Sequence, residues 1–504
     1  MKIQILLTLI FASFASAFQW YPLGNWIEEE GTPDRAGHCV ANSQDGKIIA
    51  ISAPHYSTEE KPGLRFGRVV VYTFDELRDA WDKLGGDITG AEEDSFGSSL
   101  GMSDDGKTII VGSLNNNKNG VMAGMVQVFV LDNVTDDKKW IQKGPTLYGD
   151  NAFDEFGYSV DVKDGGEVIV IGSPGEDSSG KDNTGAVRVY KWGSTSSVWE
   201  PVEEVIKGTE NNGRFGHSVA LSQVGIIAVG EPHALNYMGK VMIVRYNATG
   251  ATWDITHNIE RDEAIKEGDM FGYSVSVSFD GSTIAVGAPR HKGNGNSLNK
   301  LSGAVTVHKY DESLNEWNQR GGEIIGRSAG DQSGTSVHLS DDGMEVAIGA
   351  PFSSKGKTQA GRISVYRWED AWEIMDVDID GKTAFSNLGY SVAISGDGEQ
   401  VIGGAPMEGY ATVYQLAETA SPTSSPTLPP SKGKRGGGGK RSSFIRVIFN
   451  IAIAGLVMFA IVKIIMVIRH RRSLATFQPT AVNDLEMEMT PNGVPAEGET
   501  RDII

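Results

Sequence analysis

Short runs in which apolar and polar residues alternate recur along the chain and predict β-strands. In residues 158–208, the runs "YSVDV", "EVIVIGSP" and "GAVRVY" are rich in β-branched residues and are separated by glycine-containing turns, and "WEPVEEVIKG" follows them. Alternation with a period of two is typical of strands that bury one face. The stretch therefore predicts four antiparallel strands joined by turns.

This four-strand pattern is a repeat that occurs seven times. Each copy begins with a Phe-Gly pair or a variant of it, and a Gly-x-Pro signature or its variant follows within seventeen residues. Consecutive copies are 55 to 62 residues apart. The glycines that mark the copies are Gly37, Gly97, Gly157, Gly216, Gly272, Gly334 and Gly389. Seven copies of four antiparallel strands predict an all-β, seven-bladed β-propeller.

The order of the strands predicts how the ring closes. A strand led by Trp20 precedes the first copy, whereas no such strand follows the seventh copy, which ends in "ATVYQL" (411–416). An open β-solenoid is the alternative, but this shift of phase favours a closed ring. We expect residues 18–30 to supply the outer strand of blade seven, because the strand covers an edge that would otherwise promote aggregation.

The copies resemble FG-GAP repeats, and residues 18–416 resemble the propeller head of integrin α-subunits. The resemblance rests on the two signatures in seven-fold register. It implies a propeller that binds a partner outside the cell. Integrin propellers also carry calcium loops of the form Asp-x-Asp-x-Asp-Gly, but the corresponding turns here, such as "SDDGK" (103–107), hold at most two acids. We therefore predict no metal and no cofactor.

The two ends of the chain predict a membrane-anchored protein. Residues 1–17 combine one lysine, an apolar stretch and small residues, which is typical of a signal peptide cleaved after Ala17. Residues 447–468 are mostly apolar and long enough to span a bilayer as a helix. Residues 417–446 form a stem rich in Pro, Ser and Thr and then in Gly, Lys and Arg, and residues 469–504 form a tail too short for a folded domain.

The charges around the predicted span conflict with the signal peptide. More Lys and Arg residues precede the span than directly follow it, which alone would place the head in the cytosol. We give the signal peptide precedence, because large domains translocate largely regardless of charge. We expect a single-pass type I protein of the plasma membrane or an internal membrane, with the propeller extracellular or lumenal. Arg469, Arg471 and Arg472 are candidate contacts for anionic lipid headgroups.

The predicted head is strongly acidic and has one cysteine. The chain has a net charge of −20, and residues 18–421 alone carry −26. This charge argues against nucleic acid as a partner of the head. Cys39 stands where other copies have serine, so we interpret it as a small buried residue and not as a reactive thiol.

Acidic and histidine residues recur at equivalent places in the copies. Aspartates stand three residues before the repeat glycine at Asp34, Asp94, Asp154, Asp269 and Asp331. They could form a crown of cation ligands, but we favour caps on the turn into the inner strand, because the residue recurs with the fold. His55, His233 and His291 occur in blades one, four and five, too far apart to share a zinc ion. No nucleophile and base occur at interpretable spacing, so we predict no catalytic residues.

Strand direction predicts which loops share a face. Loops before the Phe-Gly strands and after the Gly-x-Pro strands lie on one face, which we call the FG face. Both glycosylation sequons, at Asn133 and Asn247, follow a third strand, so we expect the sugars and the stem on the opposite face, the exit face. The variable loops of the FG face supply the candidate ligand-binding residues His55, Tyr56, Glu176, Asp177, His233, Tyr237, Arg290, His291, Lys292 and Phe352.

These features favour a cell-surface recognition or adhesion receptor whose FG face is distal to the membrane and binds an extracellular protein or glycan. Two alternatives stay open, a membrane-anchored propeller enzyme that acts on polysaccharide and a structural wall-anchoring protein. Buried carboxylates with raised pKa values in the central channel would favour the enzyme. Exposed aromatic and basic groups on one face would favour the receptor.

Overall fold

The computed structural model describes eight segments of the chain: residues 18–28, 34–132, 138–178, 180–202, 205–247, 252–261, 268–293 and 301–418. Within these segments, no helix is long and apolar enough to cross a membrane. The predicted signal peptide, span and tail and nearly all of the stem lie outside the described segments, and so does Asn133.

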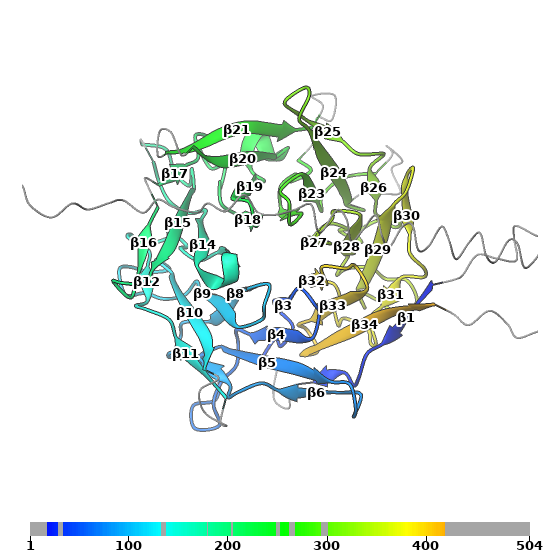
Figure 1. Cartoon of the computed structure of the whole chain (residues 1–504), viewed down its shortest axis with the longest axis horizontal. Helices are drawn as coiled ribbons and strands as arrows, with labels where there is room; N and C mark the ends of the chain where they lie inside the picture. Colours follow the sequence, from blue (N-terminus) through cyan, green and yellow to red (C-terminus); the bar gives the residue numbers. More distant parts are fainter. Residues whose placement is uncertain are drawn as a thin grey trace, which may run out of the picture. The chain divides into compact units, whose positions relative to one another are not determined.

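Seven antiparallel sheets form a ring around a central channel (Figure 1). In each sheet, the first strand of a repeat lies next to the channel and the following strands lie progressively farther out. Each innermost strand contacts the innermost strands of both neighbouring sheets, including the first and the last along the chain. The predicted all-β, seven-bladed propeller is therefore confirmed.

The strands follow the repeat closely. Blade one contains β3 (Val40–Asn42), β4 (Ile48–Ala53), β5 (Arg68–Asp75), β6 (Ala80–Lys83) and β7 (Ile88–Thr89). Blade two contains β8 (Phe96–Met102), β9 (Thr108–Ser113), β10 (Met125–Asp132), β11 (Lys139–Gln142) and β12 (Leu147–Tyr148). Blade three contains β13 (Ser159–Lys163), the short 3-10 turn η1 (Asp164–Gly166), β14 (Val168–Ser173), β15 (Ala186–Gly193), β16 (Val198–Pro201) and β17 (Ile206–Lys207). Blade four contains β18 (Ser218–Leu221), β19 (Ile226–Glu231), the four-residue α2 (Ala234–Tyr237), β20 (Lys240–Asn247) and β21 (Thr252–Glu260).

The remaining blades repeat this order. Blade five contains β22 (Ser274–Val277), β23 (Thr283–Ala288), β24 (Ala304–Asp311), β25 (Glu316–Gln319) and β26 (Ile324–Ile325). Blade six contains β27 (Ser336–Leu339), β28 (Glu345–Gly349), β29 (Arg362–Trp368), β30 (Trp372–Ile374) and β31 (Ile379–Asp380). Blade seven contains β32 (Ser391–Ile394), β33 (Gln400–Ala405), β34 (Tyr410–Glu418) and, from the start of the chain, β1 (Phe18–Pro22) and β2 (Ile27–Glu28).

The outer strand is broken into two pieces in most blades, a detail that the sequence pattern did not predict. Both pieces pair with the third strand of the blade. In blades one, two and five a glycine with positive φ lies at the break, namely Gly85, Gly144 and Gly321. In blade four the described outer strand, β21, is continuous, and it carries one extra residue, Thr256, as a bulge opposite Ile243 and Val244.

The start of the chain closes the ring, as predicted. β1 pairs antiparallel with β34, from Phe18 opposite Glu418 to Pro22 opposite Tyr414, and β2 pairs with the beginning of the same strand. Trp20 is buried in the core between blades six and seven. Residues distant in sequence thus complete one sheet and cover its edge.

The hydrophobic core lies mainly between adjacent blades. At the seam between blades three and four, for example, Val187 and Val189 pack with Val219 and Val229, and the fully buried Phe215 belongs to the same cluster. Each blade therefore depends on its neighbours for burial, as expected of a ring of repeats.

The seam also explains the Phe-Gly signature. The backbone of Phe215 bridges that of Gly185 in the preceding blade. The next residue, Gly216, has φ of +86°, and a Cβ there would lie 2.6 Å from the carbonyl oxygen of Ala186. A larger residue would therefore both strain the backbone and push the blades apart.

Side-chain hydrogen bonds join the blades in the same register. Ser159 Oγ donates to the carbonyl oxygen of Gly216 at 2.8 Å, and Trp199 Nε1 donates to that of Lys143 at 2.9 Å. Equivalent serine bonds come from Ser99, Ser218, Ser274 and Ser336, and equivalent tryptophan bonds come from Trp81, Trp140, Trp253 and Trp372. Cys39 takes the place of the serine in blade one, and burial raises the pKa of its thiol to about 12, which agrees with a structural role.

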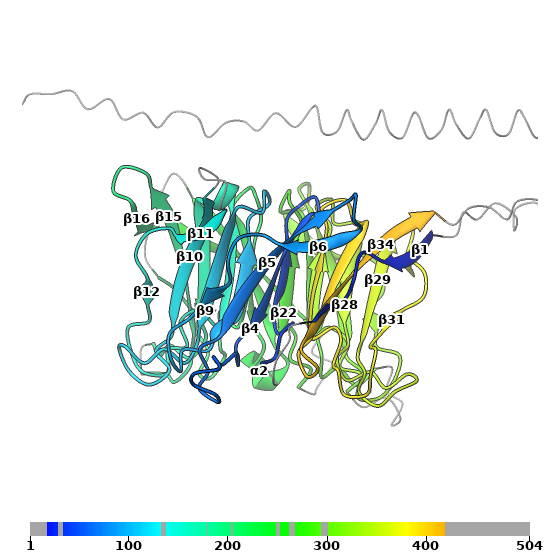
Figure 2. The same cartoon turned by 90° about the horizontal axis from the view of Figure 1, so that it is seen from below.

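The two faces are distinguished by α2 and by the end of β34. In Figure 2, α2, which follows the second strand of blade four, lies on one side of the disc, and β34 ends near the other. Asn247, exposed at the end of β20, follows a third strand and so shares the second side. The first side is the FG face and the second is the exit face, where the described part of blade seven ends.

Candidate ligand-binding site

The ten predicted binding residues lie on loops of five different blades and do not form one cluster. Only His233 and Tyr237 line the same described pocket. Arg290 and Lys292 are exposed in blade five, and Phe352 is half-buried in blade six. Of the predicted residues, only His233 and Tyr237 therefore share one recessed site, on blade four, and the others lie separately on other loops.

Two of the predicted residues are bonded to partners in the interior. Glu176 is buried, and its Oε2 lies 2.6 Å from Arg188 Nη1. His291 is also buried, and its Nδ1 lies 2.8 Å from Asp269 Oδ2. Both side chains hold the base of their loops, so they are poorly placed to touch a ligand.

Three others make local contacts near the surface. The guanidinium of Arg68 lies over the ring of Tyr56, 4.1 Å from its centroid. Asp177 is exposed, and its Oδ1 accepts a hydrogen bond from the backbone N–H of Asn183 at 2.7 Å. Burial, helped by nearby arginines, lowers the pKa of His55 to about 4, so this imidazole is neutral at neutral pH.

Three of the recurrent aspartates cap turns. Asp154 and Asp331 accept a hydrogen bond from the backbone N–H three residues before them, in Asn151 and Ser328, and Asp34 accepts one from the backbone N–H two residues after it, in Ala36, at 2.8 to 3.0 Å. These contacts support the interpretation as turn caps. Across the described segments, no three His, Cys, Asp or Glu side chains are grouped as a metal site requires.

A recessed polar pocket opens on the FG face between the loops of blades three and four. We call it the blade-four pocket. Its volume is about 690 Å³, within the range usual for small-ligand sites. It is lined by Lys181, Asn183, Thr209, Glu210, Asn211, Asn212, Arg214, His233, Leu235, Asn236 and Tyr237.

The backbone of α2 shapes this pocket. Leu235, Asn236 and Tyr237 have φ of 53°, 58° and 66°, a left-handed conformation that residues other than glycine adopt rarely. Position 237 has a counterpart with positive φ in other blades, such as Gln359. Among the loops that the structure describes at this place, the left-handed pair before it occurs only in the short loop of blade four. Local strain of this kind persists only where the surroundings impose it, and it is concentrated at functional sites.

An aromatic pair forms one wall of the pocket. The rings of His233 and Tyr237 lie 4.7 Å apart, and Tyr237 is half-exposed. Burial, together with Arg214 and Arg290, lowers the pKa of His233, so the imidazole is uncharged at neutral pH. The wall therefore offers two neutral ring faces, tilted by 44° to each other, with polar edges.

A buried ionic group supports the pocket from below. Lys240 Nζ lies 2.6 Å from Glu210 Oε1 and 3.4 Å from Glu231 Oε2. The other oxygen of Glu210 accepts a hydrogen bond from the backbone N–H of Leu235 at 3.0 Å. Burial would raise the pKa of Glu210, but the bonds from Lys240 and Leu235 outweigh it and lower the pKa. The left-handed turn is thus tied to a charged network that also includes Glu231.

A collar of polar and aromatic side chains surrounds the channel on the FG face. The residues that follow the repeat glycines form it: His38, Ser98, Tyr158, His217, Tyr273, Thr335 and Tyr390. His217 lies between Tyr158 and Tyr273, with tilted rings whose centroids are 4.8 Å apart on each side. Burial, with Arg214 and His233, lowers the pKa of His217 to about 3. The collar is therefore uncharged and rich in rings.

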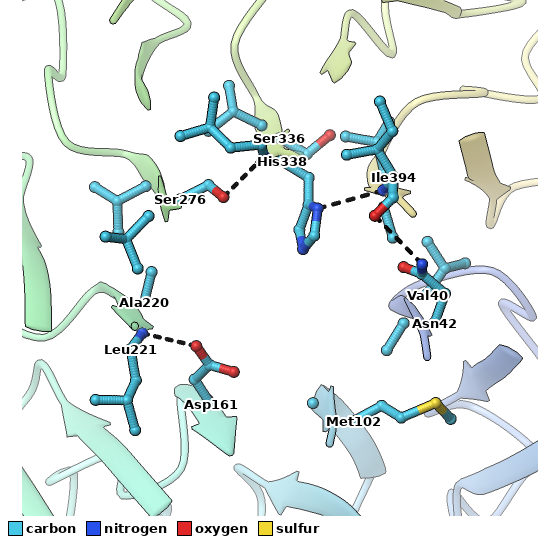
Figure 3. Close-up of a pocket in the computed structure, with 18 of the residues that line it drawn as sticks. Val40, Asn42, Met102, Asp161, Ala220, Leu221, Ser276, Ser336, His338 and Ile394 are labelled. Carbon is cyan, nitrogen blue, oxygen red and sulfur yellow. Dashed lines mark hydrogen bonds between the residues drawn. The ribbon is translucent and has the colours of Figure 1, made fainter. Parts of the chain in front are cut away.

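Below the collar, the inner strands enclose a cavity of about 290 Å³ (Figure 3). Polar side chains in this cavity bond to the next blade. Asp161 Oδ2 accepts from the backbone N–H of Leu221 at 2.7 Å, and His338 Nδ1 accepts from that of Ile394 at 3.3 Å. Burial raises the pKa of Asp161 and lowers that of His338 to about 4. These groups satisfy backbone donors at the inner edge of the blades.

A charged side chain lies at the end of this cavity nearer the exit face. Lys163 stands where other blades have a turn serine, such as Ser103, and its Nζ lies 3.1 Å from Asp104 Oδ1. Burial disfavours the ammonium, but Asp161 and Asp104 outweigh it and raise the pKa of Lys163. Asp341 Oδ2 accepts from Gln44 Nε2 at 2.5 Å, and burial raises the pKa of Asp341.

Sequence reasoning missed most of the blade-four pocket. Asn211, Asn212 and Asn236 were not singled out, because asparagines are common in loops and no spacing marks them. A usable signal existed at Glu231, which replaces the alanine or serine of the other copies, and at Lys163, which replaces a serine. A residue that differs from its counterparts in all other copies is not required by the propeller fold, so another role has to explain it.

No protein-family model matches the chain, and a comparison with curated proteins found no significant similarity. The resemblance to FG-GAP repeats and integrin heads therefore rests on the repeat motifs alone.

Proposed function

We propose that this protein is a cell-surface recognition or adhesion receptor of the FG-GAP type, anchored by one transmembrane helix, whose FG face binds an extracellular protein or glycan. One observation carries the proposal. The FG face holds a recessed polar pocket and an aromatic collar, and it is opposite to the face at which the described part of blade seven ends.

The chemistry of the FG face supports a binding role. Tyr237 and Met407 are each about half-exposed there, and Arg290 adds an exposed positive charge to an otherwise acidic head. Exposed aromatic groups and arginine are enriched where proteins bind partners. The predicted stem would hold this face away from the membrane, and a sugar on the exposed Asn247 would leave it free.

A propeller enzyme is the second candidate. Asp161 and Asp341 line the channel and have raised pKa values, which is a property of many catalytic acids. Both oxygens of Asp161 accept backbone hydrogen bonds, however, and Asp341 is bonded to Gln44. An enzyme of this kind would release reducing sugars from polysaccharide and lose that activity in Asp341→Asn.

Added glycans can test which face binds. Gly356→Asn completes a sequon with Lys357 and Thr358 in the FG-face loop of blade six. Gly356 has φ of +88° and no atom near a Cβ, so asparagine, which tolerates this backbone, fits there. As a matched control, Glu312→Asn with Leu314→Thr creates a sequon on the exposed exit-face turn of blade five.

The measurement is adhesion of cells that express the full-length chain to a layer of cells from the species that makes it. We expect Gly356→Asn to reduce adhesion at least tenfold and the control pair to leave it within twofold. Surface amounts are matched by antibody staining. If only the exit-face glycan blocks adhesion, or if neither does, the FG face is not the binding face.

A further inference from the structure

The blade-four pocket presents several amide donors. Asn211 and Asn212 each use their side-chain oxygen as an acceptor within the protein, from Asp182 N–H and Asn183 Nδ2. Within the described segments, their amide Nδ2 groups donate no hydrogen bond, and the amide of Asn236 makes none. Three amides therefore present hydrogen-bonding groups to whatever occupies the pocket.

The same pocket pairs these amides with a ring surface. Tyr237 is half-exposed, and its ring contacts that of His233 at a tilt of 44°. A ligand that suits this wall has a flat apolar face and many hydroxyl groups at its rim. Sugar rings have this combination, because their axial C–H groups form apolar patches between polar hydroxyls.

The charges of the pocket are locally positive. Lys181 is exposed at its rim, and Arg214, half-buried, uses Nη2 to bind Glu155, which leaves further guanidinium donors. Among the lining residues, Glu210 is the one acid, and both its oxygens are occupied by Lys240 and by Leu235 N–H. In a head with a net charge of −26, this is a place where an anionic group gains charge-assisted hydrogen bonds.

We infer that the blade-four pocket binds an acidic oligosaccharide, with the asparagine amides and Tyr237 holding a sugar ring and with Lys181 and Arg214 binding its carboxylate. This inference rests on the proposed function and names the ligand class of the FG face. The left-handed turn at Leu235 and Asn236 fixes Tyr237 in its half-exposed position before the ligand arrives, which lowers the entropic cost of binding.

The test uses purified full-length protein and immobilised oligosaccharides of defined structure. The acidic probes are oligomers of galacturonate, mannuronate and guluronate, hyaluronan fragments and sialyllactose, and the neutral probe is fully methyl-esterified oligogalacturonate. We expect saturable binding of at least one acidic probe. If that probe is oligogalacturonate, esterification should weaken binding at least tenfold.

A matched pair of variants separates the pocket from the rest of the FG face. Tyr237 and Phe385 are similarly exposed aromatics with φ of 66° and 65°, but Phe385 belongs to blade seven. Tyr237→Ala and Lys181→Ala should weaken binding at least tenfold, and Phe385→Ala should change it less than twofold. Thermal unfolding of each variant shows that the fold is kept.

Failure of this inference is distinguishable from failure of the proposed function. If no acidic probe binds saturably, or if Tyr237→Ala and Phe385→Ala have equal effects, the pocket is not an acidic-glycan site. Adhesion that is still lost with the blade-six glycan would then leave the receptor proposal standing with another ligand. The opposite result would overturn the receptor proposal instead: an acidic probe binds saturably in the pocket, but the blade-six glycan leaves adhesion unchanged.

Discussion

Glu231 should make the stability of the propeller depend on pH near neutrality. Its side chain is fully buried in β19, where the other blades have alanine or serine. Lys240 Nζ lies 3.4 Å from Oε2, and neither oxygen of Glu231 accepts a hydrogen bond from a described residue. Burial raises the pKa of Glu231 to about 7, and Lys240 offsets this effect only in part.

The sign and size of the effect follow from this pKa. The unfolded chain releases the proton near the usual pKa of 4.5, whereas the folded chain keeps it up to about 7. The stabilisation from the protonated form is therefore complete below pH 4.5 and is lost as the pH rises to about 7. At about 1.4 kcal/mol per pH unit, the loss is roughly 3 kcal/mol, or about 4 °C in Tm for a domain of roughly 400 residues.

The assay compares Glu231→Gln with the parent chain by thermal unfolding between pH 4 and 8.5. Glutamine has nearly the same shape and cannot ionise, so the two proteins should have similar Tm values near pH 4.5. The variant should become the more stable one by a few degrees above pH 7. Glu316→Gln, at an exposed site on β25, removes one carboxylate without changing a buried group and provides the baseline.

A difference in Tm between parent and Glu231→Gln that stays constant from pH 4 to 8.5 would refute the reasoning. It would mean that Glu231 titrates alike in the folded and unfolded chains. Glu231→Ala, which restores the residue of blades one, five, six and seven, should also lose the pH dependence, although the cavity it leaves lowers stability at every pH.

The other predictions concern closure and metal. Because Trp20 is buried between blades six and seven and Tyr21 is exposed on the other side of β1, Trp20→Ala should lower the free energy of unfolding by about 3–5 kcal/mol, and Tyr21→Ala by less than about 1 kcal/mol, in denaturant titrations. Equal effects would contradict closure by β1. Removal of residues 18–30 should expose the edge of β34 and produce aggregates in light scattering, and a monomer with unchanged melting would argue otherwise. Addition of EDTA should change the Tm of the protein by less than about 1 °C relative to the untreated protein, and a larger drop would reveal a missed cation site.

The sequence by itself determined the architecture, because strand and turn preferences are encoded in neighbouring residues and the same preferences recur in every copy. The alternation of apolar residues, the turns and the Phe-Gly glycines define each blade, and the position of Trp20 before the first copy determines how the seventh is completed. Every seam requires a residue with a left-handed backbone, such as Gly216, so the number of these glycines gives the number of blades. The break in the outer strands could not be predicted from this pattern, because it depends on how each outer strand pairs with the third strand of its blade.

The tertiary structure alone decided which loop residues form a site. His233 and Tyr237 meet Asn212 and Lys181 because a short loop of blade four lies beside a longer loop of blade three, and loop conformation depends on neighbours distant in sequence. Burial likewise decided that Glu176 and His291 bond to partners in the interior, while Tyr237 stays half-exposed. Periodic contacts are encoded locally, whereas a pocket arises where the repeats differ, and only the folded ring brings those differences together.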